Sequence, residues 1–343
     1  MIRTLVVDDS ALIRAMIAQV LSDDKRFQLV GEAGNGQEAI EAAKSKTPDL
    51  IIMDIHMPLM DGIQATKNIS SFSSAAIIGF TTDDTMNTVY QCMNAGALDV
   101  LKKPELANMT QQALTDFLDK LYLLTTNKRK VSVKSSAGTP LEIPEHGKFS
   151  LLVIGASTGG PPAIHTVLKG LCLDSNGNEV PFPLPIVITQ HIDKDFDDQF
   201  ANWLNNATNM PIKLADEGEI PLPGHVYIAR ACTHLEIIKK GSGFILHQND
   251  DEPLHFLKPS VDKMFYSVAE AAKQSVLAVL LTGMGRDGAD GMKRISDNGG
   301  WTIAQDGESC VVFGMPKAAI DAGGVKTILP LTDIAHFIRR MVC

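Results

Sequence analysis

Hydrophobic and polar positions follow two repeating patterns along this chain. Short aliphatic runs end abruptly at small or polar residues, which predicts buried strands. Between these runs, apolar residues recur every three or four positions, which predicts helices with one buried face. Ser10, for example, can cap a helix whose apolar stripe includes Ile13 and Ile17. Strands that alternate with helices imply an α/β fold with parallel, doubly wound sheets.

Five strands are predicted in the first part of the chain, and polar residues stand where they end. The strands cover residues 4–7, 29–33, 50–53, 75–80 and 97–101. In a parallel sheet the carboxyl ends of the strands share one edge, where binding sites form. We therefore expect five polar side chains to converge there. They are Asp8, Asp9, Asp54, Thr81 and Lys103.

Three carboxylates at one edge repel each other unless a cation offsets them. Mg²⁺ prefers oxygen ligands and keeps positions open for water or phosphate. A carboxylate beside it can attack phosphorus, while a lysine and a hydroxyl hold the transferred oxygens. A single aspartate at a strand end is better explained as a turn or cap residue. Five matching side chains at strand ends favour a phosphoryl-transfer site instead.

The second part of the chain repeats the alternation around a turn rich in small residues. Strands are predicted over residues 151–154, 185–191, 224–229, 276–281 and 301–305, with a hairpin over 235–247 and helices over 162–168 and 260–272. Ser157 follows the first strand, His191 ends the second, and Asp287 follows the strand over 276–281. If these strands are parallel, the three side chains meet at one edge.

A serine hydroxyl becomes a good nucleophile only when a base removes its proton, and neutral imidazole does this near neutral pH. A carboxylate then orients the imidazole. Taken singly, Ser157 could be a helix cap, His191 an interior histidine and Asp287 a turn residue. Their joint placement favours a catalytic triad. The glycine turns around Ser157 and Met284 could supply N–H groups to an oxyanion.

Two other patterns overlap the serine turn. Residues 155–159 satisfy G-x-S-x-G, but the order Ser, His, Asp differs from that of α/β-hydrolases. Residues 155–160 also partly match the dinucleotide fingerprint, with serine in place of the middle glycine. A nucleotide-dependent enzyme therefore remains an alternative. A second domain that only docks partners is a further alternative.

Composition narrows the class of protein. With 343 residues, roughly two domains are expected. The net charge of -9 and the missing helix-turn-helix signal disfavour nucleic-acid binding. Five scattered cysteines without a CxxC pair suggest a reducing compartment, and we predict a cytoplasmic protein without a signal peptide or membrane-inserted segment. The predicted domains are residues 1–124 and 149–343, joined by a linker over 125–148 that is rich in basic and small residues.

The first domain resembles the receiver domain of two-component response regulators. The resemblance rests on Asp8-Asp9, on residues 53–62 (MDIHMPLMDG), on Thr81 and on Lys103-Pro104. It implies that Asp54 accepts a phosphoryl group. It further implies Mg²⁺ held by Asp9, Asp54 and the His56 carbonyl, with Asp8 supporting the metal. Thr81 and Lys103 would contact the phosphate.

The second domain is similar to the chemotaxis protein-glutamate methylesterases of the CheB family. The matching segments are residues 155–161 (GASTGGP), 190–191 (QH), 223–229 (PGHVYIA), 259–262 (PSVD), 281–288 (LTGMGRDG) and 310–320 (CVVFGMPKAAI). The resemblance implies Ser157 as nucleophile, His191 as general base and Asp287 as orienting acid. Thr158 would tune the histidine, and the Met284 amide would bind the oxyanion. It implies no cofactor for this domain.

The two resemblances together imply a phosphorylation-activated serine hydrolase. It would hydrolyse glutamate methyl esters, and deamidate glutamines, on the cytoplasmic segments of chemoreceptors. A chemotaxis histidine kinase would supply the phosphoryl group to Asp54. Phosphorylation would loosen an interface through which the receiver occludes the esterase site.

Overall fold

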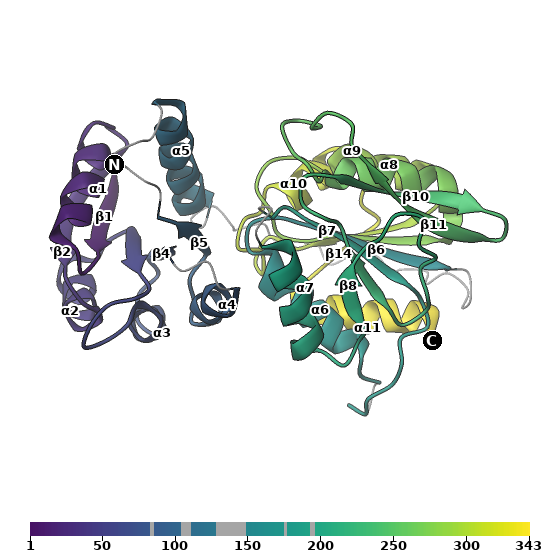
Figure 1. Cartoon of the computed structure of the whole chain (residues 1–343), viewed down its shortest axis with the longest axis horizontal. Coiled ribbons are helices and arrows are strands. Elements are labelled where there is room, and N and C mark those ends of the chain that lie inside the picture. The colour runs from purple at the N-terminus through teal and green to yellow at the C-terminus, as the bar shows by residue number, and fades with distance from the viewer. Residues whose placement is uncertain (83–85, 104–110, 128–148, 175–176, 193–195) are drawn as a thin grey trace. The chain divides into compact units, whose positions relative to one another are not determined.

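The computed structural model describes residues 1–82, 86–103, 111–127, 149–174, 177–192 and 196–343. The chain divides into two compact units, Met1–Lys130 and Val131–Cys343. Each unit is an α/β layer structure built on one parallel sheet (Figure 1). The α/β fold class predicted from the alternating pattern is thus confirmed for both units.

Five parallel strands in the order β2-β1-β3-β4-β5 form the sheet of the first unit. The strands are β1 (Ile2–Val7), β2 (Phe27–Ala33), β3 (Leu50–Asp54), β4 (Ala76–Thr81) and β5 (Asp99–Lys102). The helices are α1 (Ala11–Ser22), α2 (Gly36–Lys46), α3 (Gly62–Ser70), α4 (Met86–Asn94) and α5 (Gln111–Asn127). Helices α1 and α5 lie on one face, with α2, α3 and α4 on the other (Figure 1).

The strand order of this sheet reverses between β1 and β3, which pair in parallel. Every residue of β3 and β4 is buried, as expected of strands covered by helices on both faces. A crevice opens at such a reversal, beyond the carboxyl ends of the two strands. Asp8 and Asp54 stand at those two ends.

Helix α5 ends at Asn127, so residues 125–127 of the predicted linker belong to the helix and that boundary was placed too early. The helix continues because Leu124 and Thr125 are still buried. The Thr125 hydroxyl donates a hydrogen bond to the Leu121 carbonyl at 2.8 Å. The rest of the predicted linker, residues 128–148, lies outside the described residues.

Seven parallel strands form the sheet of the second unit, in the order β14-β13-β12-β6-β7-β9-β8. The strands are β6 (Leu151–Ala156), β7 (Ile186–Gln190), β8 (Ile212–Leu214), β9 (Val226–Ile228), β12 (Val276–Leu280), β13 (Trp301–Gln305) and β14 (Thr327–Leu329). The hairpin strands β10 (His234–Lys240) and β11 (Gly243–Asn249) pair antiparallel, apart from this sheet.

Six α-helices are described in this unit. They are α6 (Gly160–Leu171), α7 (Asp197–Ala207), α8 (Val261–Ala272), α9 (Ala289–Asp297), α10 (Met315–Asp321) and α11 (Leu331–Val342), and a 3₁₀ turn (Lys273–Ser275) leads into β12. Helices α8, α9 and α10 cover one face of the sheet, and α6, α7 and α11 cover the other (Figure 1). The chain order reverses between the two central strands, β6 and β12.

In the part of the chain that the structure describes, no helix is long and apolar enough to cross a membrane.

Candidate active site and receiver site

The candidate triad stands at the carboxyl ends of three adjacent strands. Strand β6 pairs with β7 on one side, where Ala156 lies opposite Gln190, and with β12 on the other. Ser157 and His191 each come directly after their strands, and Asp287 lies in the turn that follows β12. The His191 N–H continues the ladder by donating to the Ala156 carbonyl at 3.2 Å. Ser157 and His191 therefore sit side by side on one sheet edge.

Ser157 is held in a turn between β6 and α6. Its N–H donates to the Thr282 carbonyl at 3.1 Å, and its carbonyl accepts from the Gly160 N–H at 2.7 Å. Gly159 has φ +74°, and a Cβ there would lie 2.5 Å from Val311. Only glycine fits this position without strain. The turn lifts the half-buried Ser157 off the sheet at the start of a helix.

Asp287 is buried and accepts four hydrogen bonds. Oδ2 accepts from His191 Nε2 and the Val261 N–H, both at 2.7 Å, while Oδ1 accepts from Ser260 Oγ at 2.8 Å and the Asp262 N–H at 3.0 Å. Burial alone would raise the pKa of Asp287, but the contact with His191 and the N–H groups of Asp262 and Val261 bring its pKa below the usual value. Asp287 is thus an ionised carboxylate that accepts a hydrogen bond from the Nε2–H group of His191.

This contact fixes the tautomer of His191. With the proton on Nε2, the Nδ1 atom is left as the basic nitrogen of the ring. Among the hydrogen bonds of the described residues, none joins the Ser157 hydroxyl to His191. Such contacts commonly tighten only when substrate binds.

Two residues that hold the triad were not assigned roles from the sequence, although both lie in the segments that carried the resemblance. Gln190 Nε2 donates to the carbonyls of Ser157 at 3.0 Å and His191 at 2.9 Å. Ser260 caps α8 and donates to Asp287. A polar residue next to a predicted strand end, or at a predicted helix start, is the only signal that the sequence offers for them.

Two amides near Ser157, those of Thr158 and Met284, are candidates to receive an oxyanion. Thr158 directly follows the nucleophile, and Met284 directly follows Gly283. A Cβ on Gly283 would lie 2.9 Å from Ser157 Cβ, so this turn packs against the nucleophile. Within the described residues, neither amide donates a hydrogen bond to another group. Both N–H groups are therefore available to a ligand.

Next to the triad acid lies a second buried carboxyl group, that of Asp262. Its Oδ1 accepts from the Gly291 N–H at 2.6 Å. Burial, together with the charges of Asp287 and Asp290, raises the pKa of Asp262 to about 7. The native state therefore binds a proton here more tightly than the unfolded chain, and its stability falls as pH rises from about 4 to about 7.

Asp262→Asn is expected to remove this dependence. The difference in unfolding free energy between the variant and the wild type should favour the variant more at about pH 9 than at about pH 5. Chemical unfolding, measured with a chelator present, can be followed by the fluorescence of Trp203 and Trp301. Both tryptophans of the chain lie in the second unit. An equal difference between variant and wild type at both pH values would contradict the raised pKa.

In the first unit, Lys103 joins the two buried acids at the sheet edge. Its Nζ lies 2.7 Å from Asp8 Oδ2 and 2.9 Å from Asp54 Oδ2. Burial, together with the charge of Asp8, keeps the pKa of Asp54 above its usual value although Lys103 lowers it. Burial opposes the charge of Lys103 as well, but its ion pairs hold its pKa above the usual value. The three groups form one compact ionic cluster.

Asp9 completes a set of three carboxylates. One oxygen each of Asp8, Asp9 and Asp54 lies within 4.8 Å of the others, and Asp9 is exposed. The His56 N–H donates to Asp54 Oδ1 at 3.3 Å, and the buried Thr81 accepts the Lys103 N–H through its carbonyl at 2.7 Å. Oxygen donors of this kind suit a hard divalent cation.

Comparison with known families identifies the chain. The family described as CheB methylesterase matches residues 152–338, which is more than half of the chain. The chain belongs to the CheB methylesterase family. The response regulator receiver domain family matches residues 4–115. The family predicted from the sequence is thereby confirmed.

Relatives of the CheB family match along nearly the whole chain. A protein of Nitrosospira multiformis is 35% identical, over 100% of this chain and 97% of its own length. One of Carboxydothermus hydrogenoformans is 39% identical, over 97% of both chains. They are named protein-glutamate methylesterase/protein-glutamine glutaminase, the second with the number 1. The solved Thermotoga maritima CheB methylesterase catalytic domain is 35% identical and covers 57% of this chain and 99% of its own, with a TM-score of 0.52.

Proposed function

We propose that this chain is a phosphorylation-activated serine hydrolase that removes methyl groups from glutamate γ-methyl esters of chemoreceptors and deamidates glutamines there. The observation that carries the proposal is the 2.7 Å contact between His191 Nε2 and Asp287, on the same sheet edge as Ser157. The names of the CheB-family relatives support the substrate class. The receiver match supports control by phosphorylation.

In the proposed reaction, His191 Nδ1 takes the proton of the Ser157 hydroxyl as Oγ attacks the ester carbonyl. The Thr158 and Met284 amides would donate to the oxyanion of the tetrahedral intermediate. Collapse breaks the bond to the methoxy group, which leaves as methanol with the proton from His191. Water, deprotonated by His191, then hydrolyses the acyl-enzyme and regenerates Ser157. A glutamine side chain would follow the same path and release ammonia.

His191 must carry a positive charge during each half of this reaction. Asp287 stabilises that charge without taking the proton, because its four hydrogen bonds favour the ionised form. The imidazole ring of His191 cannot flip easily, because it is Nε2 that makes the hydrogen bond to Asp287. The roles of the two ring nitrogens are thus the reverse of those in the chymotrypsin template, where the acid binds Nδ1.

In the receiver, Asp54 would take a phosphoryl group from a chemotaxis histidine kinase. Asp8, Asp9, Asp54 and the His56 carbonyl are the groups that would hold Mg²⁺, which neutralises charge on the transferring oxygens when it is bound. Lys103 and Thr81 would contact the phosphoryl oxygens. Lys103 already lies 2.9 Å from Asp54, so little movement is needed.

The proposed setting is the cytoplasm, where chemoreceptors present their methylated segments. We propose no nucleic-acid partner and no direct insertion into the membrane. We also propose that the esterase unit needs no cofactor, because a serine, an imidazole and a carboxylate supply every proton transfer in the reaction.

Beryllofluoride, a phosphoryl mimic, tests the regulation. With Mg²⁺ present it should raise methanol release from methylated receptors by about 5–150-fold, the range of a coupling free energy of about 1–3 kcal/mol. Asp54→Ala should show no response. The control is Asp61→Ala, which changes an aspartate that caps α3 without belonging to the carboxylate set. An equal response from wild type and Asp54→Ala would overturn the proposed switch.

A further inference from the structure

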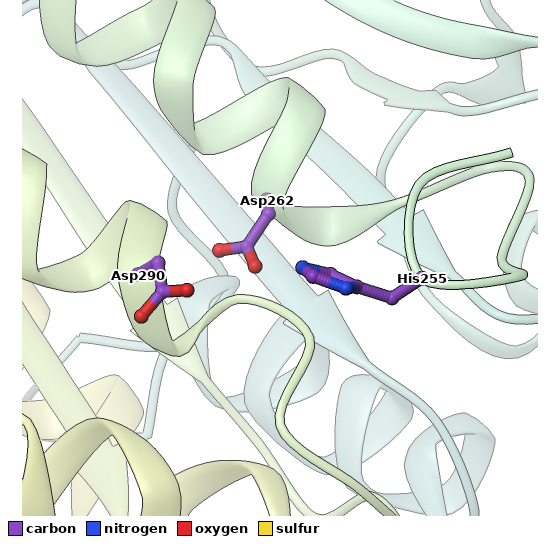
Figure 2. A group of neighbouring side chains, drawn as sticks. All are labelled: His255, Asp262 and Asp290. Atoms are coloured by element: carbon purple, nitrogen blue, oxygen red, sulfur yellow. The ribbon is translucent and has the colours of Figure 1, made fainter. Parts of the chain in front are cut away.

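A second group of side chains with metal-binding chemistry lies beside the candidate active site. It consists of His255, Asp262 and Asp290, which we call the His255 cluster. One donor atom from each lies within 4.8 Å of the others. Figure 2 shows Asp262 between Asp290 and His255, with the imidazole ring of His255 directed toward Asp262. His255 comes from the loop before α8, and the two aspartates come from the first turns of α8 and α9.

Helix capping explains only part of this arrangement. Acidic residues in a first turn are stabilised by the helix dipole, which accounts for Asp290 and for the bond from Gly291 to Asp262 Oδ1. Capping does not explain the other carboxylate oxygen of Asp262, Oδ2. Asp262 is 0% exposed, and in the part of the chain that the structure describes its Oδ2 has no hydrogen-bond partner. A buried carboxylate oxygen without a partner is costly unless a ligand satisfies it.

The excess of negative charge around Asp262 also favours a bound cation. Asp262 also lies against Asp287, whose Oδ1 accepts its N–H at 3.0 Å. Arg286 pairs with Asp290 at 2.8 Å, but the side chain of Arg286 is 62% exposed and much of its charge is screened. Two nearby lysines form ion pairs with other aspartates. Lys258 pairs with Asp250, and Lys263 pairs with Asp251.

We propose that the His255 cluster binds a divalent transition-metal cation, with Zn²⁺ as the best match. One imidazole nitrogen and two carboxylate oxygens are a common donor set for zinc, whereas Mg²⁺ and Ca²⁺ prefer oxygen donors alone. Zinc bonds of about 2.0–2.2 Å require the donors to be within about 4 Å of each other. The three donor atoms already lie within 4.8 Å of one another, so only small side-chain movements are needed to meet this requirement.

Such an ion would tie three separate segments together. The loop before α8 and the first turns of α8 and α9 would share one centre. One of these segments, the first turn of α8, also contacts Asp287, since the Val261 and Asp262 N–H groups donate to it. Zinc binding should therefore raise the unfolding temperature of the second unit, because a ligand that binds only the native state stabilises it.

The test is a titration of the chelator-treated full chain with Zn²⁺, followed by calorimetry. Excess Mg²⁺ keeps the all-oxygen site of Asp8, Asp9 and Asp54 occupied. We expect one zinc site whose affinity falls at least about tenfold in His255→Ala and in Asp290→Asn, because each variant removes one ligand. His336→Ala is the matched control, since it removes an exposed histidine on α11, which covers the opposite face of the sheet.

Two further measurements make the result decisive. Co²⁺ in place of Zn²⁺ should give a visible absorption band that is lost in His255→Ala and kept in His336→Ala. The unfolding temperature, followed by tryptophan fluorescence, should rise more with Zn²⁺ in the wild type than in His255→Ala or Asp290→Asn. Zinc affinity that is undetectable in the wild type, or unchanged in both cluster variants, would overturn the proposal.

Discussion

Ser157→Ala is expected to lower kcat for methanol release from methylated receptors by on the order of 10⁴–10⁶-fold. The variant removes the Oγ atom that is proposed to form the acyl-enzyme, while the Ser157 N–H and carbonyl keep their bonds to Thr282 and Gly160. The turn therefore retains its shape, and the residual rate reports binding and the oxyanion donors alone. Methanol release from a purified methylated receptor, with a phosphodonor present, measures this loss.

The control for this variant is Ser242→Ala, an exposed serine in the turn between β10 and β11. It should keep the wild-type rate. A fluorophosphonate probe should label the wild type and Ser242→Ala but leave Ser157→Ala unlabelled. Full esterase activity in Ser157→Ala would show that another residue is the nucleophile, and an absence of labelling in the wild type would favour a second domain that only docks partners.

Asp287→Asn is expected to lower kcat by about 10⁴-fold, as loss of the correct imidazole tautomer does in serine proteases. The reason lies in the donors around the carboxylate. Both oxygens of Asp287 accept two hydrogen bonds each, and all four partners are donors. An asparagine must point its NH₂ group at one pair of them, either His191 and Val261 or Ser260 and Asp262. Either choice leaves buried donors facing each other.

The companion variants separate catalysis from folding. Ser260→Ala removes one of the four donors and should cause a much smaller loss of kcat, because Asp287 stays ionised. Asp297→Asn changes an exposed aspartate on α9 and should behave as the wild type. Circular dichroism checks that Asp287→Asn is folded. A folded Asp287→Asn variant with wild-type kcat would remove Asp287 from the mechanism.

Much of the fold could be predicted because its strands are long and uniformly apolar. The run over residues 276–281 predicted β12, and all five residues of that strand are buried. The three-residue strands β8 and β14 were not predicted, because each mixes buried and exposed positions, whereas the equally short β9 is buried throughout. Helix α11 was missed as well, although its buried residues Ile334, Ile338 and Met341 recur at helical spacing.

The site was predicted from where strands end, and this rule has a clear limit. It indicates which residues reach the sheet edge, so it indicates Ser157 and His191. It says nothing about side chains that hold them from neighbouring positions. Gln190 is the last residue of β7, and its buried amide carries no apolar signal. Ser260 acts from the start of a helix that is distant in sequence from Asp287, and only the packing of α8 against the sheet brings them together.

The double bond from Gln190 has a consequence for how such an enzyme can be switched. One amide group donates to the backbone of both Ser157 and His191, so the nucleophile and the base are carried as a single rigid piece. A Cβ on Gly160 would lie 2.0 Å from Gln190 Oε1, which leaves no slack on the other side of that amide. A regulatory signal is therefore not expected to act by separating Ser157 from His191. It is expected to act by controlling which molecules reach the assembled pair.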